Sequence, residues 1–492
     1  MTLEAAMDAV PKSAPHHPDN AARNRLVIAI LLVSTFVVFL NETIMSVAIP
    51  HLMDDLGVTA SAAQWLTTAF LLTMAVVIPI TGFLLQRINT RPIFLLAMSI
   101  FSVGTLICAL ATGLELLIVG RVVQATGTAI MMPLLMTTVM TLVSPEGRGR
   151  TMGNISIVMS VAPAIGPTIG GFILAHFDWR FMFYFTLPIA LGALALGAAR
   201  IRNVSNPRYA PLDLVSVLLS VFAFGGLVYG LSSLGEASGE GAPVPAWAPI
   251  GLGLVAMIAF VWRQTRLQSE EKALLDLRAL THRNYTTALV TMAIAMVALL
   301  GSSILLPIYT QNVLGLDTLQ TGMILLPGGL LMGLMGPIVG RLYDRVGPRP
   351  LLVPGVIMVS AVMWALTFVS QYTPIWAVVA GHIVLSLGLA LAFTPLFTAS
   401  MGSVPSRLYS HASAILGSVQ QVAGAAGIAL FVAVMSLRAA AAAAEGLDGV
   451  DALAAGIRSG FLCGAIISLL MVIAAFFVRK PEGGEPGHGH GH

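Results

Sequence analysis

Apolar residues occur along this chain in long continuous runs, separated by short stretches that contain charged residues, Pro and Gly. About fourteen runs are present, and most are close to the ~20 residues that a helix needs to cross a bilayer. The runs do not alternate apolar and polar positions, so the pattern excludes a transmembrane barrel and predicts helices. The predicted spans are 26–49, 62–86, 92–112, 115–142, 151–175, 180–200, 212–234, 245–263, 285–313, 319–342, 349–370, 374–402, 408–437 and 457–478.

The composition agrees with a membrane protein. Hydrophobic residues make up 57% of the 492 residues and charged residues only 10%, whereas soluble domains carry about 25% charged residues. The sequence therefore predicts an all-α polytopic membrane protein. Cys108 and Cys463 both lie in apolar runs, so we interpret them as packing residues and not as a disulfide.

Several classes of function find no support in the sequence. The basic residues are scattered over short loops without interleaved aromatic residues, which gives no support for binding of nucleic acid. We find no nucleotide-binding loop, metal-ligand spacing or hydrolytic triad, so we expect no enzyme, no cofactor and no metal site. The tail Gly487–His492 is compatible with weak metal binding, with a disordered end or with a cloning remnant.

Charge alternates in sign from one loop to the next. The loop after the second span carries Arg87 and Arg91, whereas the loop after the first span carries Asp54 and Asp55, and this alternation continues along the chain. Because loops rich in Arg and Lys stay in the cytosol, and because the span count is even, we expect both termini in the cytosol. The exceptions to the alternation are Arg180, Arg438 and Arg458.

One motif occurs twice. "GFLLQRINTRP" (Gly82–Pro92) follows the second span, and "GRLYDRVGPRP" (Gly340–Pro350) follows the tenth. Six spans surround each copy and two more, near 212–234 and 245–263, lie between the halves, which is typical of transporters built from a duplicated six-span unit. After the inserted pair, we predict a short helix at Glu270–Leu280 on the cytosolic face.

The repeat divides the chain into two six-helix bundles joined by the inserted pair. The first residues are polar, contain three Pro and lack the basic start and short apolar core of a signal peptide. The predicted segments are a disordered cytosolic tail (1–25), a first six-helix bundle (26–203), two inserted helices with a cytosolic linker (204–284), a second six-helix bundle (285–479) and a disordered tail (480–492).

At these motifs the sequence resembles the major facilitator superfamily, in its 14-span drug:proton antiporter branch of the EmrB/QacA type, from about Arg25 to Arg479. The repeated loop resembles the family pattern G-x-L-x-D-R-x-G-R-R/K, which is thought to latch the halves on the cytosolic side; a tight turn with a positive anchor is the alternative. The first copy has Gln86 where the family has Asp, so only a neutral hydrogen bond is expected there. The residues of this cytosolic gating motif are Gly82, Arg87, Arg91, Gly340, Asp344, Arg345 and Arg349.

Three further stretches carry the resemblance. "LLIVGRVVQATGTAIMMP" (Leu116–Pro133) resembles the family's fourth-span motif, and "DWRFMFYFTLPI" (Asp178–Ile189) resembles the start of its sixth span. "SVAPAIGPTIGG" (Ser160–Gly171) resembles the fifth-span antiporter motif that the family associates with export, with packing of small residues as the alternative. The matching residues of the antiporter motif are Gly166, Pro167, Gly170 and Gly171.

The first span contains an acid. "FLNETIMSVAIP" (Phe39–Pro50) resembles the family pattern L-D-x-T-I-V-N-V-A-L-P, in the variant of lincomycin-resistance-like members, with Asn41 at the usual Asp position and Glu42 one residue later. A charge inside a bilayer costs about 2.5–3.5 kcal/mol on insertion scales and usually marks a pathway. Glu42 and Arg121 lie at matching depth, about 10 Å below the outer surface at 1.5 Å per residue. We therefore expect them to pair, either for proton coupling or as a static structural pair.

The resemblance implies a proton-driven exporter of amphiphilic or cationic drugs, working by alternating access in the bacterial cytoplasmic (inner) membrane. Its partners would be the drug, protons and the bilayer, with a periplasmic adaptor and an outer-membrane channel as candidates. A dedicated exporter of one metabolite, such as an amino acid or a siderophore, and a membrane sensor that does not transport are the alternatives. The candidate substrate-binding residues are Asn41, Trp65, Gln124, Asn154, Tyr309, Gln311 and Gln420.

Overall fold

The computed structural model describes residues 18–45, 48–204, 207, 211–236, 245 and 247–481. In these ranges the chain forms helices and no strand. Fourteen helical stretches are long and apolar enough to cross a membrane, which confirms the predicted all-α fold and its span count. The helices are α1 (Pro18–Met45), α2 (Ile49–Leu56), α3 (Ala60–Arg87), α4 (Thr90–Ala109), α5 (Leu114–Leu142), α6 (Arg148–His176), α7 (Phe181–Arg200), α8 (Leu214–Ser220), α9 (Gly226–Glu236), α10 (Trp247–Leu267), α11 (Arg283–Asn312), α12 (Thr318–Val346), α13 (Arg349–Ala365), α14 (Ile375–Gly402), α15 (Tyr409–Ala444) and α16 (Gly449–Ala475).

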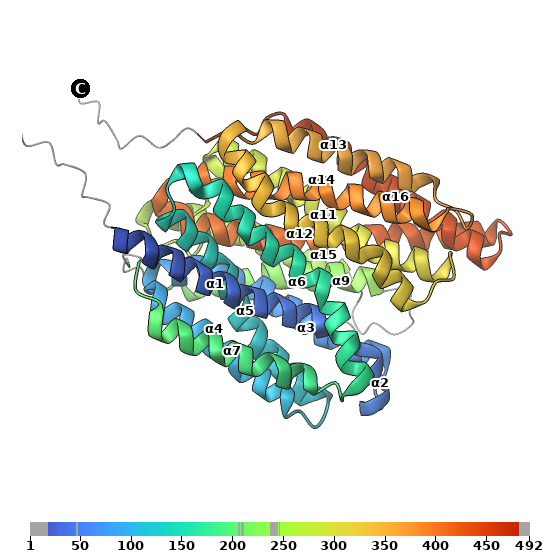
Figure 1. Ribbon diagram of the computed structural model, residues 1–492, viewed down its shortest axis with the longest axis horizontal. Helices are drawn as coiled ribbons and strands as arrows, with labels where there is room; N and C mark the ends of the chain where they lie inside the picture. Colours follow the sequence, from blue (N-terminus) through green and yellow to red (C-terminus); the bar gives the residue numbers. More distant parts are fainter. Residues whose placement is uncertain are drawn as a thin grey trace, which may run out of the picture.

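The long helices form two bundles that lie side by side (Figure 1). The first bundle consists of α1 and α3–α7, and the second of α11–α16. A π-helical turn, Val221–Gly225, joins α8 to α9 into one inserted span, which packs against α3 of the first bundle and α15 of the second. α10, the other inserted span, packs on this one. The inserted pair therefore lies along the seam between the bundles.

The two ends of the bundles carry different loops. The described chain begins and finishes at the same end (Figure 1). We call this end, which also holds both copies of the repeated motif, the basic end, and the opposite end the acidic end. The basic end is the one that we predict to be cytosolic. The described residues of its loops are 88–89, 143–147, 201–204, 207, 211–213, 268–282, 347–348 and 403–408.

The first span begins earlier than predicted. α1 starts at Pro18, so residues 18–25 belong to a helix and not to a disordered tail. Pro is favoured at the first position of a helix, where its missing N–H is not needed. The rest of the predicted N-terminal tail, residues 1–17, and most of the predicted C-terminal tail, residues 482–492, lie outside the described residues.

The linker segment, which we define as Gln268–Thr281, is not the short helix that we predicted at Glu270–Leu280. It contains 3-10 turns at Gln268–Glu270 and Leu277–Thr281, with no helix between them. The prediction was wrong because most apolar residues of this stretch, Leu274 and Leu275 among them, are buried in the molecule and do not form one face of a surface helix.

Polar contacts hold the linker segment in its extended course. The Leu275 N–H donates to the side-chain oxygen of Gln264 on α10 (3.1 Å). Asp276 accepts a hydrogen bond from the Arg278 N–H (3.0 Å) and pairs with the Arg278 guanidinium (2.6 Å). Leu274 and Leu275 are buried. The segment thus inserts apolar side chains into the basic end of the molecule.

α6 and α12 belong to different bundles and run antiparallel in close contact. At the basic end, a Cβ on Gly340 would collide with the carbonyl oxygen of Gly149. The contact continues to the middle of the helices, where a Cβ on Gly329 would lie 2.7 Å from the Cβ of Ala164. Small residues let two helix backbones approach this closely, so this seam is closed from the basic end inward.

Hydroxyl groups also join the bundles in the basic-end half. Ser156 of α6 and Thr394 of α14 share a hydrogen bond of 2.7 Å. Thr137 of α5 and Ser413 of α15 share one of 3.0 Å. All four residues lie within nine residues of the basic end of their helices. The structure therefore describes a state in which the bundles are closed at the basic end.

Candidate functional site

The two predicted coupling residues lie near each other in the first bundle. Glu42 is half-buried on α1, three residues before this helix ends at Met45. Arg121 is only 2% exposed on α5, which packs against α1. Among the described residues, however, no ion pair within 4.0 Å joins them. The structure brings the two charges together without a direct contact.

Other groups hold the guanidinium of Arg121 in place. Its Nη1 donates to the side-chain oxygen of Gln124 one turn further along α5 (2.7 Å). The Gln124 amide in turn donates to the Thr105 hydroxyl of α4 (2.8 Å). The ring of Phe70 on α3 lies against the guanidinium, 4.0 Å from Cζ to the ring centroid. In the described structure Nε of Arg121 is buried with no hydrogen-bond partner, so the donors of this cation are not all satisfied.

Only two of the predicted substrate-binding residues lie beside these charges. Gln124 is one, as described above. Asn41 is buried next to Glu42, and its amide donates to the Thr186 hydroxyl of α7 (3.3 Å). Trp65 is 42% exposed and stacks on Tyr229 of α9, with 5.9 Å between ring centroids. Trp65 therefore contacts the inserted span.

The other four candidates lie elsewhere. Tyr309 is buried, and its hydroxyl donates to the Ser370 carbonyl (2.8 Å), which ties α11 to the loop before α14. Asn154, Gln311 and Gln420 are half-buried on α6, α11 and α15. In the described structure, none of the four makes a hydrogen bond with either charged residue of the first bundle. Their role in substrate binding stays a prediction.

The antiporter motif packs α6 onto α1 beside the acid. A Cβ on Gly166 would collide with the Thr43 side chain, and a Cβ on Gly170 would lie 2.9 Å from the Ile44 carbonyl oxygen. These glycines therefore let the α6 backbone touch the turn of α1 that carries Glu42. The remaining residues of the motif do not take part, because Pro167 is exposed and Gly171 has no atom within 4 Å of its Cβ position.

The second copy of the gating motif forms a direct contact between the bundles. The Asp344 carboxylate accepts hydrogen bonds from the N–H groups of Gly149 (2.8 Å) and Arg150 (2.9 Å), at the start of α6. Carboxylates are favoured there because the first N–H groups of a helix lack partners and carry partial positive charge. Arg349 donates to a carbonyl oxygen of its own bundle (3.1 Å), and Arg345 is exposed.

The first copy makes a weaker contact across the seam. The Gln86 amide donates to the Arg407 carbonyl oxygen of the second bundle (3.3 Å), as its neutral side chain predicts. The Cβ position of Gly82 lies 3.1 Å from the Cβ of Ala414 on α15. Arg87 lies over a ring of α3, and Arg91 donates to a carbonyl oxygen of α7 (2.8 Å), so both interact with their own bundle.

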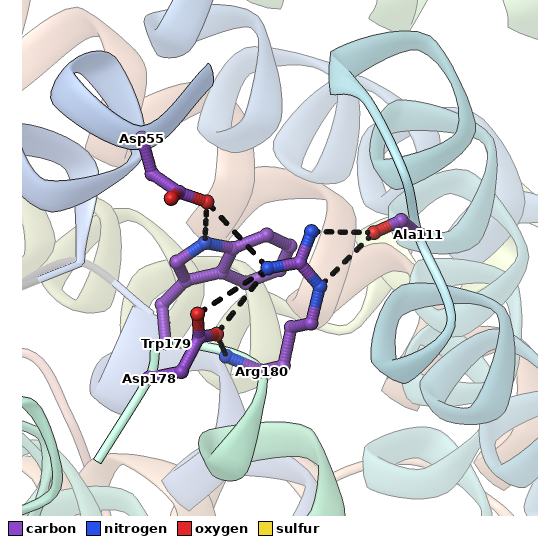
Figure 2. Close-up of polar contacts among 5 residues, drawn as sticks. All are labelled: Asp55, Ala111, Asp178, Trp179 and Arg180. Atoms are coloured by element: carbon purple, nitrogen blue, oxygen red, sulfur yellow. Dashed lines mark hydrogen bonds and ion pairs between the residues drawn. The ribbon is translucent and has the colours of Figure 1, made fainter.

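A polar cluster at the acidic end accounts for one exception to the charge alternation. Figure 2 shows Arg180 donating to the Ala111 carbonyl oxygen (3.1 and 3.2 Å) and pairing with Asp55 (3.5 Å) and Asp178 (3.4 Å). Trp179 donates from its indole N–H to Asp55 (2.8 Å), and its ring lies 4.1 Å from the guanidinium. We call these five residues the acidic-end cluster, which joins α2 to two loops.

Sequence reasoning missed several residues of this region. Phe70 contacts Arg121, and Thr105 accepts a hydrogen bond from Gln124 of the same helix. Phe70 belongs to an apolar row with Met74 and Ile78 on α3, and this four-residue spacing is visible in the sequence. The spacing predicts a packed helix face, but it does not reveal that a cation lies at one end of the row.

Comparison with known proteins gives consistent matches. Residues 31–428 match the model of the family described as the Major Facilitator Superfamily. An uncharacterized MFS-type transporter, YcnB of Bacillus subtilis (strain 168), is 38% identical over 93% of this chain and 95% of its own length. The lincomycin resistance protein LmrB of Listeria monocytogenes serovar 1/2a is 37% identical over 93% of this chain and 97% of its own length.

A solved structure supports the same fold. The crystal structure of the human organic anion transporter MFSD10 superimposes with a TM-score of 0.68, covering 92% of this chain and 99% of that protein. At 16% sequence identity, this similarity concerns the fold alone.

Proposed function

This chain belongs to the Major Facilitator Superfamily, a family of transporters and not of enzymes, and from that premise we propose that it exports amphiphilic or cationic drugs in exchange for protons. A relative that matches nearly the whole chain is a lincomycin resistance protein, which supports drug export. We place the protein in a bacterial inner membrane with its basic end in the cytosol, because loops rich in Arg stay on that side.

The observation that carries the coupling proposal is the half-buried acid of α1 beside the buried Arg121. Glu42 has no ion-pair partner among the described residues, so its carboxyl group is free to take a proton or a cation. In the proposed cycle a proton neutralises Glu42 in one state, and the drug cation replaces that proton in the other. Exchange of one proton for one singly charged drug moves no net charge, so the pH gradient drives this cycle and supplies about 1.4 kcal/mol, or a roughly tenfold drug gradient, per pH unit.

Alternating access supplies the movement. The bundles meet through glycines and hydroxyl groups in their basic-end half, which supports a state closed toward the cytosol. Rocking of the two six-helix bundles about a central site would open this seam and close the opposite one, as in other transporters with repeated halves.

Replacement of the acid tests the proposal. In vesicles with an imposed pH gradient, we expect Glu42→Gln to abolish gradient-driven dye efflux, because a neutral amide cannot release a proton. Glu115→Gln is a matched control, since Glu115 is exposed in the first turn of α5 at the acidic end. Efflux by Glu42→Gln at the rate of the unmodified protein would exclude Glu42 as the coupling site. Efflux of one metabolite only would favour a dedicated exporter.

A further inference from the structure

One row of side chains on α3 connects the second bundle to the coupling site. Phe70, Met74 and Ile78 follow one another at four-residue spacing and are all buried. Residues at this spacing lie on one face of a helix. Together with Ala125 and Ala129 of α5 they form a separate small apolar cluster, so the row packs against the helix that carries Arg121.

The two ends of the row have different neighbours. At its basic-end side, Ile78 contacts α15 of the second bundle, because a Cβ on Gly417 would lie 3.1 Å from Ile78 Cγ2. At its other side, the ring of Phe70 lies 4.0 Å from the guanidinium carbon of Arg121. A continuous set of packed groups therefore runs from the bundle seam to the cation.

Pro79 makes this part of α3 deformable. It lies inside the helix directly after Ile78. A proline inside a helix removes the hydrogen bond to the carbonyl four residues earlier and favours a bend. When α15 moves away from Ile78, α3 can therefore change its course near the row.

The ring of Phe70 is an important neighbour for the charge of Arg121. The cation is almost fully buried, makes one hydrogen bond to a neutral amide, and keeps Nε without a partner in the described structure. The face of an aromatic ring attracts a cation, and the attraction is stronger when both groups are removed from water. The ring therefore fixes where this guanidinium lies relative to Glu42.

We propose that Phe70 is a positioning residue for Arg121, and that the row Phe70–Met74–Ile78 makes this position depend on contact with the second bundle. In the state closed at the basic end, Ile78 packs on Gly417 and the ring holds the guanidinium away from direct contact with Glu42. When the seam opens, the row relaxes and the guanidinium is free to approach the acid. The coupling part of this inference rests on the proposed function.

A thermal double-mutant cycle tests the positioning without any transport assay. We expect the losses in apparent Tm caused by Phe70→Leu and Arg121→Met to be non-additive, because each removes the same contact. Phe101→Leu is the matched control: Phe101 is a fully buried ring on α4, and its loss should add to that of Arg121→Met. Additive losses for Phe70→Leu would overturn the positioning role.

Transport in proteoliposomes tests the coupling. We expect Phe70→Leu to lower gradient-driven export about tenfold, the scale of a desolvated cation–π contact, while drug exchange without a gradient stays within about twofold. Phe70→Tyr, which keeps the ring, should restore driven export. If Phe70→Leu lowers both activities equally, as a general packing defect would, the coupling role is wrong. If Glu42→Gln retains driven export, the proposed function fails instead, and the thermal cycle still decides the positioning.

The contact with the second bundle has its own test. Gly417→Ala would press on Ile78, whereas Gly225→Ala would press on the other side of α3, with its Cβ 3.3 Å from Val76. The two changes crowd the same helix to a similar degree. We expect only Gly417→Ala to lower the ratio of driven export to exchange. Equal effects of both variants would overturn transmission through the row.

Discussion

The two copies of the gating motif occupy equivalent places in the two bundles but close the basic end by different chemistry. In the second copy, Asp344 accepts two hydrogen bonds from the first turn of α6 in the opposite bundle. In the first copy, Gln86 donates one longer hydrogen bond to the Arg407 carbonyl oxygen. A carboxylate at a helix N-terminus gains from the helix dipole, and a neutral amide does not. The comparison indicates that the second copy contributes most of the polar closure.

The first copy has additional apolar cover. Leu275 of the linker segment lies 3.4 Å from the Cβ position of Gly82, beside Ala414 and His411 of α15. The linker segment thus packs over the α3–α15 contact, where the charged latch is absent. The α6–α12 seam is closed by a charged cap and close backbone contact. The α3–α15 seam is closed by apolar packing and a neutral hydrogen bond.

The largest difference between the copies should appear when their first glycine is replaced by Ala and the ratio of closed to open molecules is measured. Gly340→Ala places a methyl group against the carbonyl of Gly149, and overpacking of this kind costs about 1–3 kcal/mol. This corresponds to a change of roughly 5- to 150-fold in the ratio of closed to open molecules. The measurement is maleimide labelling of Ser413→Cys, a buried seam residue, after Cys108 and Cys463 are replaced by Ala.

Gly82→Ala is the matched control for this prediction. Its new methyl group would lie 3.1 Å from the Cβ of Ala414, which is tight but involves a side chain and not a backbone carbonyl. We expect labelling to change much less than for Gly340→Ala. Equal labelling of the two variants would contradict the asymmetry between the seams.

Loss of the charged cap should have the next largest effect. Asp344→Ala removes both acceptors at the start of α6, and loss of a helix cap costs about 0.5–2 kcal/mol. We expect Ser413→Cys labelling to rise roughly 2- to 30-fold, with a smaller rise for Asp344→Asn, which keeps one acceptor oxygen. Unchanged labelling of Asp344→Ala would show that close helix packing alone keeps this seam closed.

Acid should loosen the linker segment before it affects the glycine contact. Burial raises the pKa of the Asp276 carboxyl, but hydrogen bonds from Arg278 outweigh burial, and the pKa lies below its usual value. A lowered pKa stabilises the folded form above the ordinary pKa of about 3.9, and this stabilisation is lost as the pH falls through the folded-state pKa. Hydrogen exchange of the Leu275 and Arg278 amides should therefore accelerate below about pH 4, relative to their intrinsic rates. In Asp276→Asn this additional acid dependence should disappear.

Loss of the neutral hydrogen bond of the first copy should have the smallest effect on closure of the basic end. Gln86→Leu removes one exposed contact of 3.3 Å, and a hydrogen bond contributes about 0.5–1.5 kcal/mol net, with exposed ones at the low end. Ser413→Cys labelling should rise by no more than about threefold. An increase as large as that of Asp344→Ala would mean that the two copies contribute equally.

The sequence predicts the number and type of the spans because the bilayer acts on each apolar run separately. Length and hydropathy suffice for that, and the described residues form fourteen helical stretches that are long and apolar enough to cross a membrane. The linker segment was predicted wrongly because its course depends on Gln264 of another helix and on burial of Leu274 and Leu275. Local helix propensity does not predict the contact with another helix or the burial.

In the candidate site, too, the sequence predicts some residues and misses those that depend on packing between helices. The sequence singles out Glu42 and Arg121 because charges are rare inside apolar runs. It does not predict that Gln124, Thr105 and Phe70 hold the guanidinium, because these contacts depend on how α3 and α4 pack on α5. Arg180, which breaks the charge alternation in the sequence, has two partners that are distant along the chain, Asp55 and Ala111, besides its neighbour Asp178.

The acidic-end cluster gives the protein an intrinsic optical probe. The indole of Trp179 is 3% exposed, with a guanidinium over its ring and a carboxylate on its N–H, whereas Trp247 and Trp376 are 75% and 72% exposed. Aqueous quenchers should spare its fluorescence for as long as the cluster stays intact. Stopped-flow emission would then show, without any attached dye, whether the outer loops of the first bundle move as one unit during turnover.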